Sequence, residues 1–215
     1  MPQALKIDFV SDVSCPWCAI GLKSLETALE RASDVVQADL HFQPFELNPQ
    51  MGAEGQEIVE HLSAKYGISA EQVARNTEAI RQRGEAVGFT FGKGKRGRVY
   101  NTFDAHRLLH WAEGQGQQHA LKMALFKAYF TDGESPGAHD VLLRAVADVG
   151  LDVEAARAIL ASDTFAAEVR ERERFYMDQG IHSVPAIIIN DKHLISGGQP
   201  PEVFEQALRQ IAAAA

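Results

Sequence analysis

The sequence predicts an α/β fold in which a small sheet, contributed by both ends of the chain, is interrupted by a helical region. Three observations predict this fold class. Apolar runs of strand length occur near both ends, helical periodicity dominates the middle, and the opening reads strand, helix, strand, which is a βαβ unit. A length of 215 residues suits one domain with a large insertion, or two small domains that share a core.

The βαβ unit is predicted from residues 5–47. Leu5–Val10 is a short apolar run with β-branched and aromatic members, which is typical of a strand. The spacing of the apolar residues then changes to that of a helix. Pro16 fits the first turn of this helix, where a missing N–H costs nothing. Val35–Leu47 is predicted as the next strand. The helical face consists of Leu22, Leu25 and Leu29.

The middle of the chain is predicted to be helical. Ser69 and Gln72 have the spacing of a capping box, which begins a helix that runs to about Val87. Asp152 is placed to cap a later helix, and another is predicted over residues 164–179. Two further stripes follow the spacing of a buried helical face: Leu121, Ala124, Leu125, Ala128 and Tyr129, and then Leu142, Ala145, Val146 and Val149.

Strand character returns near the C-terminus. The apolar run within Pro185–Asn190 suits a strand buried on both faces. Asn190–Asp191 is a turn signal, and His193–Ser196 is predicted to be the returning partner of a hairpin. Pro200–Pro201 then opens a last helix.

Composition excludes several classes of function. A net charge of −8 and a pI near 5.5 argue against nucleic acid as a partner. No run approaches the roughly 18 apolar residues of a membrane span, and the opening MPQALKIDFV lacks the pattern of a secretory signal. We therefore expect a cytoplasmic protein without membrane or nucleic-acid partners. The sequence predicts no particular oligomeric state.

The chain has two cysteines, Cys15 and Cys18, separated by two residues. A thiolate attacks a disulfide, so a catalytic cysteine needs a lowered pKa. The start of a helix supplies unpaired N–H groups and the positive end of the helix dipole. We therefore predict that Cys15 is the exposed nucleophile and Cys18 the resolving thiol one turn later. Pro16 and Trp17 set the helix start and restrict access.

Two other interpretations of the cysteine pair are open. The pair could be half of a zinc site that His41, His182 or His193 completes, although the spacing of a second ligand pair is missing. The cysteines could also be two buried apolar residues. Redox chemistry is favoured because the pair follows a strand and opens a helix. We predict no metal and no tightly bound cofactor.

Val184–Pro185 is a second candidate for the site. A proline just before a buried strand cannot donate to the ladder, so it needs an edge position, a first-residue position or a special bond. An X-Pro bond tolerates the cis form at modest cost. Beside Cys15, such a bond would present the backbone of Val184 to a bound substrate; the alternative is an ordinary strand start.

Several motifs together resemble the DsbA-like branch of the thioredoxin superfamily, and within it the FrnE-type oxidoreductases. The resemblance implies a thioredoxin-like fold with an inserted all-helical domain. Its expected parts are residues 1–50 and 175–215 for the thioredoxin-like domain and residues 51–174 for the insertion. It also implies that Pro185 is cis and that residues 101–106 pack near the active site. The matching motifs are Asp8–Phe9, Cys15–Cys18, Asn101–Leu108, Ser183–Pro185 and Ile195–Pro200.

The resemblance implies a thiol–disulfide oxidoreductase whose partners are protein or small-molecule thiols, with glutathione as a candidate redox partner. The alternative is a glutathione-dependent transferase or isomerase, because kappa-class glutathione transferases and hydroxychromene carboxylate isomerases resemble this branch in fold. Those relatives generally carry serine where Cys15 stands and lack the second cysteine. The presence of both cysteines favours dithiol chemistry.

Weaker signals surround these motifs. Gly88–Val99 is a basic, glycine-rich segment that is either a hydrated loop or a flap. Such a flap, with Lys93 and Arg96, would attract an anionic thiol such as glutathione or an acidic protein partner. Asn101 and His106 are weak candidates for substrate binding, since a histidine on a helix is more often structural. Candidates for proton transfer at Cys18 are Asp8, Asp12 and Glu46.

Overall fold

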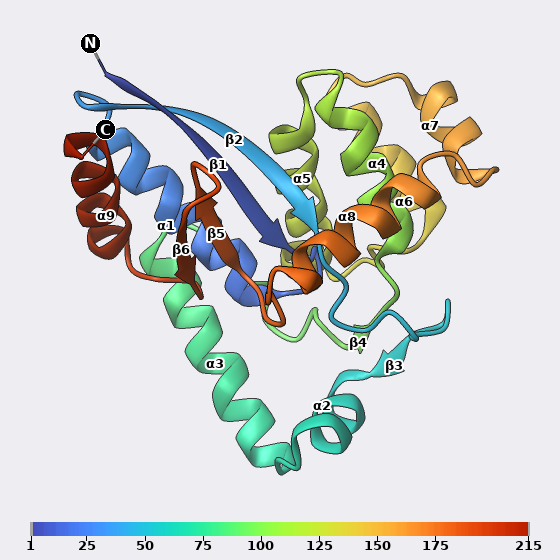
Figure 1. The fold of residues 1–215 in the computed structure, drawn as a ribbon. Helices are drawn as coiled ribbons and strands as arrows, with labels where there is room; N and C mark the ends of the chain where they lie inside the picture. Colours follow the sequence, from blue (N-terminus) through green and yellow to red (C-terminus); the bar gives the residue numbers. More distant parts are fainter. Residues whose placement is uncertain (1, 215) are drawn as a thin grey trace.

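A four-stranded sheet organises the part of the chain that the computed structural model describes, residues 2–214 (Figure 1). Its strand order is β2-β1-β5-β6. The first two strands are parallel, as a βαβ unit requires, and the other neighbouring pairs are antiparallel. The strands are β1 (Gln3–Ser11), β2 (Val36–Pro44), β5 (Ala186–Ile189) and β6 (His193–Ser196).

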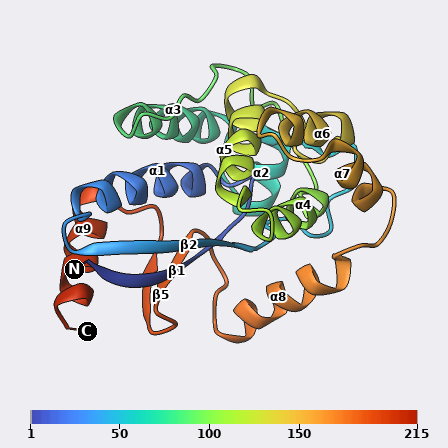
Figure 2. The same cartoon turned by 90° about the horizontal axis from the view of Figure 1, so that it is seen from above.

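Helices cover both faces of the sheet. On one face, α1 (Pro16–Arg31) and α9 (Pro201–Ala213) pack against each other and against β1 in the main core, which contains Phe9, Leu22 and Phe204. On the other face lies α8 (Ala166–Asp178), whose Tyr176 packs against Val10 of β1 (Figure 2). The central strand β1 is therefore covered on both faces, and its residues from Ile7 to Ser11 are all buried.

The segment between β2 and α8 is mainly helical and has a core of its own. Helices α4 to α7 gather at the C-terminal ends of β1 and β2 (Figure 1) and bury a second apolar cluster that includes Leu108, Leu121 and Leu142. A two-stranded ladder joins β3 to β4. The elements are β3 (Gln56–Glu57), α2 (Ile58–Tyr66), α3 (Ala70–Ala86), β4 (Arg98–Val99), α4 (Phe103–Glu113), α5 (Gln118–Phe126), the π-helix η1 (Lys127–Asp132), α6 (His139–Asp148) and α7 (Val153–Leu160).

Three features predicted from local sequence are present in the structure. The Ser69 side chain accepts from the Gln72 N–H, and the Gln72 side chain accepts from the Ser69 N–H, so the capping box is present. Asp152 accepts from the first two N–H groups beyond Val153 and caps α7. Asn190 and Asp191 take left-handed φ values of 52° and 54° in the turn between β5 and β6, which these residue types tolerate.

The structure corrects two element predictions and adds one helix. The strand predicted over 35–47 ends at Pro44, because the chain then turns into the wall of a cavity. The stripe from Leu121 to Tyr129 is not one α-helix, since η1 begins at Lys127. Helix α2 was not predicted from its sequence. Within residues 2–214, no helix is both long and apolar enough to cross a bilayer.

Candidate active site

Cys15 occupies the N-cap of α1, directly after the loop that leaves β1. Its carbonyl accepts the N–H of Cys18 at 3.1 Å, and Pro16 stands in the first turn. The sequence folds this way because proline lacks the N–H that a first helical turn leaves unpaired. The thiol of Cys15 therefore lies at the positive end of the helix, with Cys18 one turn on; both thiols are free.

The environment separates the acidities of the two thiols. Hydrogen bonding from the Cys18 thiol, then from the Cys18 N–H and the charge of Arg96, lowers the pKa of Cys15 against the opposing effects of burial and Asp12. Complete burial, and then the hydrogen bond to Cys15, hold the pKa of Cys18 well above its usual value. Cys15 is thus the thiol that ionises first, which suits a nucleophile.

The peptide bond between Val184 and Pro185 is cis, and it lies against the cysteine pair. The Cys15 thiol donates to the Val184 carbonyl at a sulfur-to-oxygen distance of 3.7 Å. Residues 169 positions apart are thereby brought together by the pairing of β1 with β5. The backbone of Val184 is placed where a substrate bound to Cys15 would meet it.

Cys15 opens onto a cavity of about 800 Å³. Its side walls come from α2 and α3, and Arg83 of α3 lies 6.0 Å from the ring of Trp17. Cys15 is only 4% exposed, so the prediction of an exposed nucleophile is wrong: the sulfur lies on a cavity floor. The lining is mainly apolar and includes Phe45, Leu62 and Ile80, with Lys65 and Arg96 as its cations.

Arg96 is the member of the basic loop that reaches the cysteines. Its guanidinium donates to the carbonyl of Ser14 at 3.3 Å and to the hydroxyl of Tyr129 at 3.1 Å. It also lies 5.5 Å from the ring centres of Tyr129 and Phe130, both in η1. The π-helix thus fixes a cation beside Cys15, in keeping with the frequent occurrence of such turns at functional sites.

Lys122 of α5 is a second cation near the cysteines, and it was not predicted. Its side chain is fully buried and lies 5.9 Å and 5.2 Å from the ring centres of Phe42 and Phe126. Burial lowers the pKa of Lys122 to about 8, with Cys18, Asp12 and Cys15 acting in the opposite direction. Its charge in turn favours the Cys18 thiolate.

A carboxylate pair lies at the edge of the cavity. Arg170 contacts Glu46, which lines the cavity, and also donates to Glu173 at 2.9 Å. Both carboxylates are buried, and burial together with the charge of Glu173 raises the pKa of Glu46. Arg170 also stacks on Phe103 at 3.7 Å. One guanidinium therefore holds two buried acids.

The remaining predicted residues lie elsewhere. Lys93 is exposed and does not line the cavity. Asn101 accepts the N–H of Phe103 at the start of α4 and contacts Glu46 at 3.5 Å. His106 is buried, with its Nε2 3.5 Å from a carboxylate oxygen of Asp12.

The acidic residues predicted as candidates for proton transfer lie in different environments. Asp8 is bound by Lys6 and Gln43. Burial acts to raise the pKa of Asp12. The hydrogen bond and charge of His106 outweigh it together with the N–H groups of Leu47 and Ser14, so the pKa of Asp12 is lowered. Asp12 is therefore a buried anion that braces the loop before Cys15. Among residues 2–214, no group of three or more histidine, cysteine or acidic side chains could hold a metal ion.

Gly198 lies in close contact with the first turn of α1. A Cβ at this position would lie 2.8 Å from the Trp17 carbonyl oxygen and 3.4 Å from the Gly21 nitrogen. We expect Gly198→Ala to lower the free energy of unfolding by about 1–3 kcal/mol, as overpacking usually does. Urea denaturation measures this loss. Gly52→Ala is the matched control, since nothing lies within 4 Å of its Cβ; equal stability of the two variants would contradict the expectation.

Known proteins resemble the chain along nearly its whole length. The family model described as DSBA-like thioredoxin domain matches residues 6–209. The crystal structure of a probable DsbA oxidoreductase from Streptomyces coelicolor is 34% identical with a TM-score of 0.91, covering 98% of this chain and 90% of that one. The uncharacterized protein YwbO of Bacillus subtilis is 26% identical, over 96% of each chain.

A more distant likeness concerns the fold alone. The cytosolic disulfide reductase DsbM from Pseudomonas aeruginosa, solved with GSH, is 17% identical with a TM-score of 0.67, covering 97% of this chain and 99% of that one. Together the matches confirm the predicted thioredoxin-like fold with a helical insertion.

Proposed function

Because the chain belongs to the DSBA-like thioredoxin domain family of thiol–disulfide oxidoreductases, we propose that it exchanges disulfides with thiol substrates through Cys15 and Cys18. One observation carries this proposal. The sulfur of Cys15, whose pKa is lowered, lies at a helix start on the floor of a cavity, 3.7 Å from the Val184 carbonyl.

The geometry supports a two-step exchange. The Cys15 thiolate attacks a substrate disulfide, which breaks that bond, forms a mixed disulfide and releases one substrate thiolate. The Val184 carbonyl lies beside the Cys15 sulfur and can align an extended substrate backbone. Cys18 then attacks Cys15, releases the second substrate thiolate and leaves a Cys15–Cys18 disulfide. Running the steps backward reduces the pair and oxidises a dithiol.

We also propose that the thiol partners include glutathione. The cavity is large enough for a small molecule, and Arg96 and Lys65 give it positive charge that an anionic thiol would meet. The disulfide reductase DsbM, which shares the fold, was solved with GSH. The FrnE-type assignment and the cytoplasmic location stay predictions.

A redox titration tests the proposal. The protein is equilibrated in buffers of varied glutathione ratio, thiols are trapped with an alkylating reagent, and mass spectrometry counts them. We expect one reversible transition in which Cys15 and Cys18 lose their free thiols together, because the oxidised state is their mutual disulfide. Failure of the two thiols to form a disulfide at any ratio would rule out dithiol exchange.

A further inference from the structure

Two apolar walls enclose the cavity above Cys15. One wall belongs to the thioredoxin-like part of the chain, since Phe45, Leu47 and Val184 line the cavity and pack against its buried clusters. The other wall comes from helices α2 and α3, which form a hairpin that stands apart from α4 to α7 (Figure 1). The apolar members of this second wall are Leu62, Tyr66, Ile68, Ala79 and Ile80.

The hairpin leaves these five side chains partly or largely exposed. Within residues 2–214, none of them packs in or against the three apolar clusters that form the cores of the protein. Tyr66 is 59% exposed, and the apolar residues that the hairpin does bury, Ile58 and Val73, do not line the cavity. Apolar surface left uncovered beside a reactive thiol indicates a binding site for an apolar group.

Polar side chains of the cavity lining are paired with one another. Lys65 donates to the Leu47 carbonyl and to the side-chain oxygen of Asn48, each at 2.8 Å. The Nε2 atom of His61 contacts the same Asn48 oxygen at 3.0 Å. A ligand therefore need not supply partners for these groups, which favours a substrate whose bound part is apolar.

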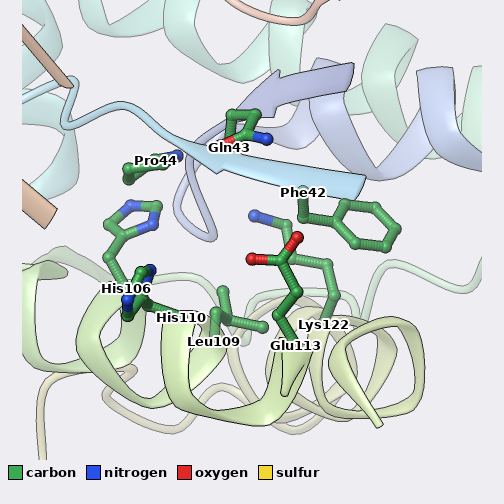
Figure 3. A pocket seen from close by; sticks show the side chains of 8 residues that line it. All are labelled: Phe42, Gln43, Pro44, His106, Leu109, His110, Glu113 and Lys122. Atoms are coloured by element: carbon green, nitrogen blue, oxygen red, sulfur yellow. The ribbon is translucent and has the colours of Figure 1, made fainter. Parts of the chain in front are cut away.

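The position of Cys15 limits the size of the substrate. Its side chain is only 4% exposed, on the floor of a cavity of about 800 Å³, which is the size of a site for a small molecule. A disulfide inside a folded protein cannot bring its sulfur atoms to this floor, whereas a slender molecule can. A second cavity, between β2, α4 and α5, holds only about 10 Å³ (Figure 3), the space of one water, and is too small for a substrate.

We propose that the disulfide substrate is a small molecule with an apolar arm, which lies against the α2–α3 wall while its sulfur is bonded to Cys15. This proposal rests on the proposed dithiol function. The Cys15 thiolate attacks one sulfur of the substrate, releases the first thiolate to solvent and holds the second arm in the cavity as a mixed disulfide. Cys18 then attacks Cys15 and releases the second thiolate. The two substrate thiols gain the two electrons and two protons of the cysteine pair, and glutathione is the reductant that restores the pair.

Single-turnover oxidation of the reduced protein by diethyl, dipropyl and dibutyl disulfide tests the substrate class. Intact mass after quenching with an alkylating reagent counts the remaining thiols. Each second-order rate constant is divided by that of free dithiothreitol with the same disulfide, which removes differences in intrinsic reactivity. We expect this normalised rate constant to rise about twofold to fourfold for each added methylene, because burial of a methylene stabilises the bound arm. The normalised rate constant for insulin, whose disulfides lie in a protein, should be below that for dibutyl disulfide.

Ile80→Asn tests the role of the hairpin wall. Isoleucine and asparagine have similar helix propensities, so the substitution mainly makes the wall polar. We expect this variant to lose most of the dependence on chain length, with dibutyl disulfide slowed at least about fivefold and diethyl disulfide much less. Val59→Asn is the matched control, because Val59 is a half-buried residue of the same hairpin that does not line the cavity. An unchanged rate of Cys15 alkylation by iodoacetamide verifies that each variant is folded.

The outcomes separate the substrate class from the reaction. Equal normalised rate constants for the three dialkyl disulfides, or a higher one for insulin, would overturn the small apolar substrate. A full dependence on chain length in Ile80→Asn would overturn the role of the hairpin. Failure of the reduced protein to react with any of these disulfides would instead refute the dithiol function itself.

Discussion

Cys18→Ser is expected to reduce disulfide turnover by at least about 10³-fold and to leave substrate covalently bound to Cys15, as the loss of one member of a covalent catalytic unit does. Cys15 keeps its helix-start position and its contact with Val184, so it can still attack. The serine hydroxyl cannot displace a thiolate from the mixed disulfide. The first half of the reaction therefore proceeds and the second stops.

Two measurements check this result: steady-state turnover of a dialkyl disulfide with a thiol reductant, and the intact mass of the protein after reaction. Cys15→Ser should lose turnover equally but show no adduct, because Cys18 is 0% exposed. Ser33→Ala, on the exposed turn after α1, is the control. If Cys18→Ser kept most of its activity toward glutathione-dependent substrates, the transferase or isomerase alternative would replace dithiol exchange.

Arg170→Met is expected to lower the free energy of unfolding by about 3 kcal/mol at pH 7, since removal of one partner leaves buried charge uncompensated. The side chains of Glu46 and Glu173 are 2% and 8% exposed, and Arg170 is the cation that both contact. The variant also loses the stacking of the guanidinium on Phe103. Methionine retains much of the apolar stem of Arg170, so the decrease in the free energy of unfolding measures mainly the effect of removing the charge.

The loss of stability in Arg170→Met should depend on pH. Burial already holds the pKa of Glu46 above its usual value, and without Arg170 it rises further. The folded variant then binds more protons than the unfolded chain above the ordinary glutamate pKa, so its stability falls as pH rises from about 4.5 toward neutrality. Urea unfolding at acidic and neutral pH measures this trend. Arg172→Met, on an exposed position of the same helix, should show neither effect; a pH-independent deficit in Arg170→Met would contradict the explanation.

The sequence predicts those parts of the fold that depend on local chemistry. The capping box at Ser69, the cap at Asp152 and the turn at Asn190 are each determined by residues within a few positions of one another, and all three formed. The end of β2 and the change to a π-helix at Lys127 depend on tertiary packing instead, and the sequence interpretation missed both. Helix α2 buries only Ile58 fully, so it has little apolar periodicity to detect.

The same division applies to the candidate site. Cys15, Cys18 and Pro185 carry motifs that a single sequence displays. Lys122 does not, because a lysine within a helical segment ordinarily faces solvent, and only the fold places it near Cys18. Glu46 and Arg170 lie 124 positions apart, so no local spacing reports their contact. Cys15 was predicted to be exposed because the wall formed by α2 and α3 could not be anticipated.

The position of β1 in the sheet has a consequence for how the protein is made. In the growing chain, β1 and both cysteines are synthesised about 175 residues before β5, which pairs with β1 through Phe9 and Ile187. Contacts of such long sequence separation make folding slow, and the nascent chain carries its reactive thiols unsheltered until β5 has been synthesised. Helices α4 to α7, by contrast, have their own apolar cluster and can fold before the sheet closes.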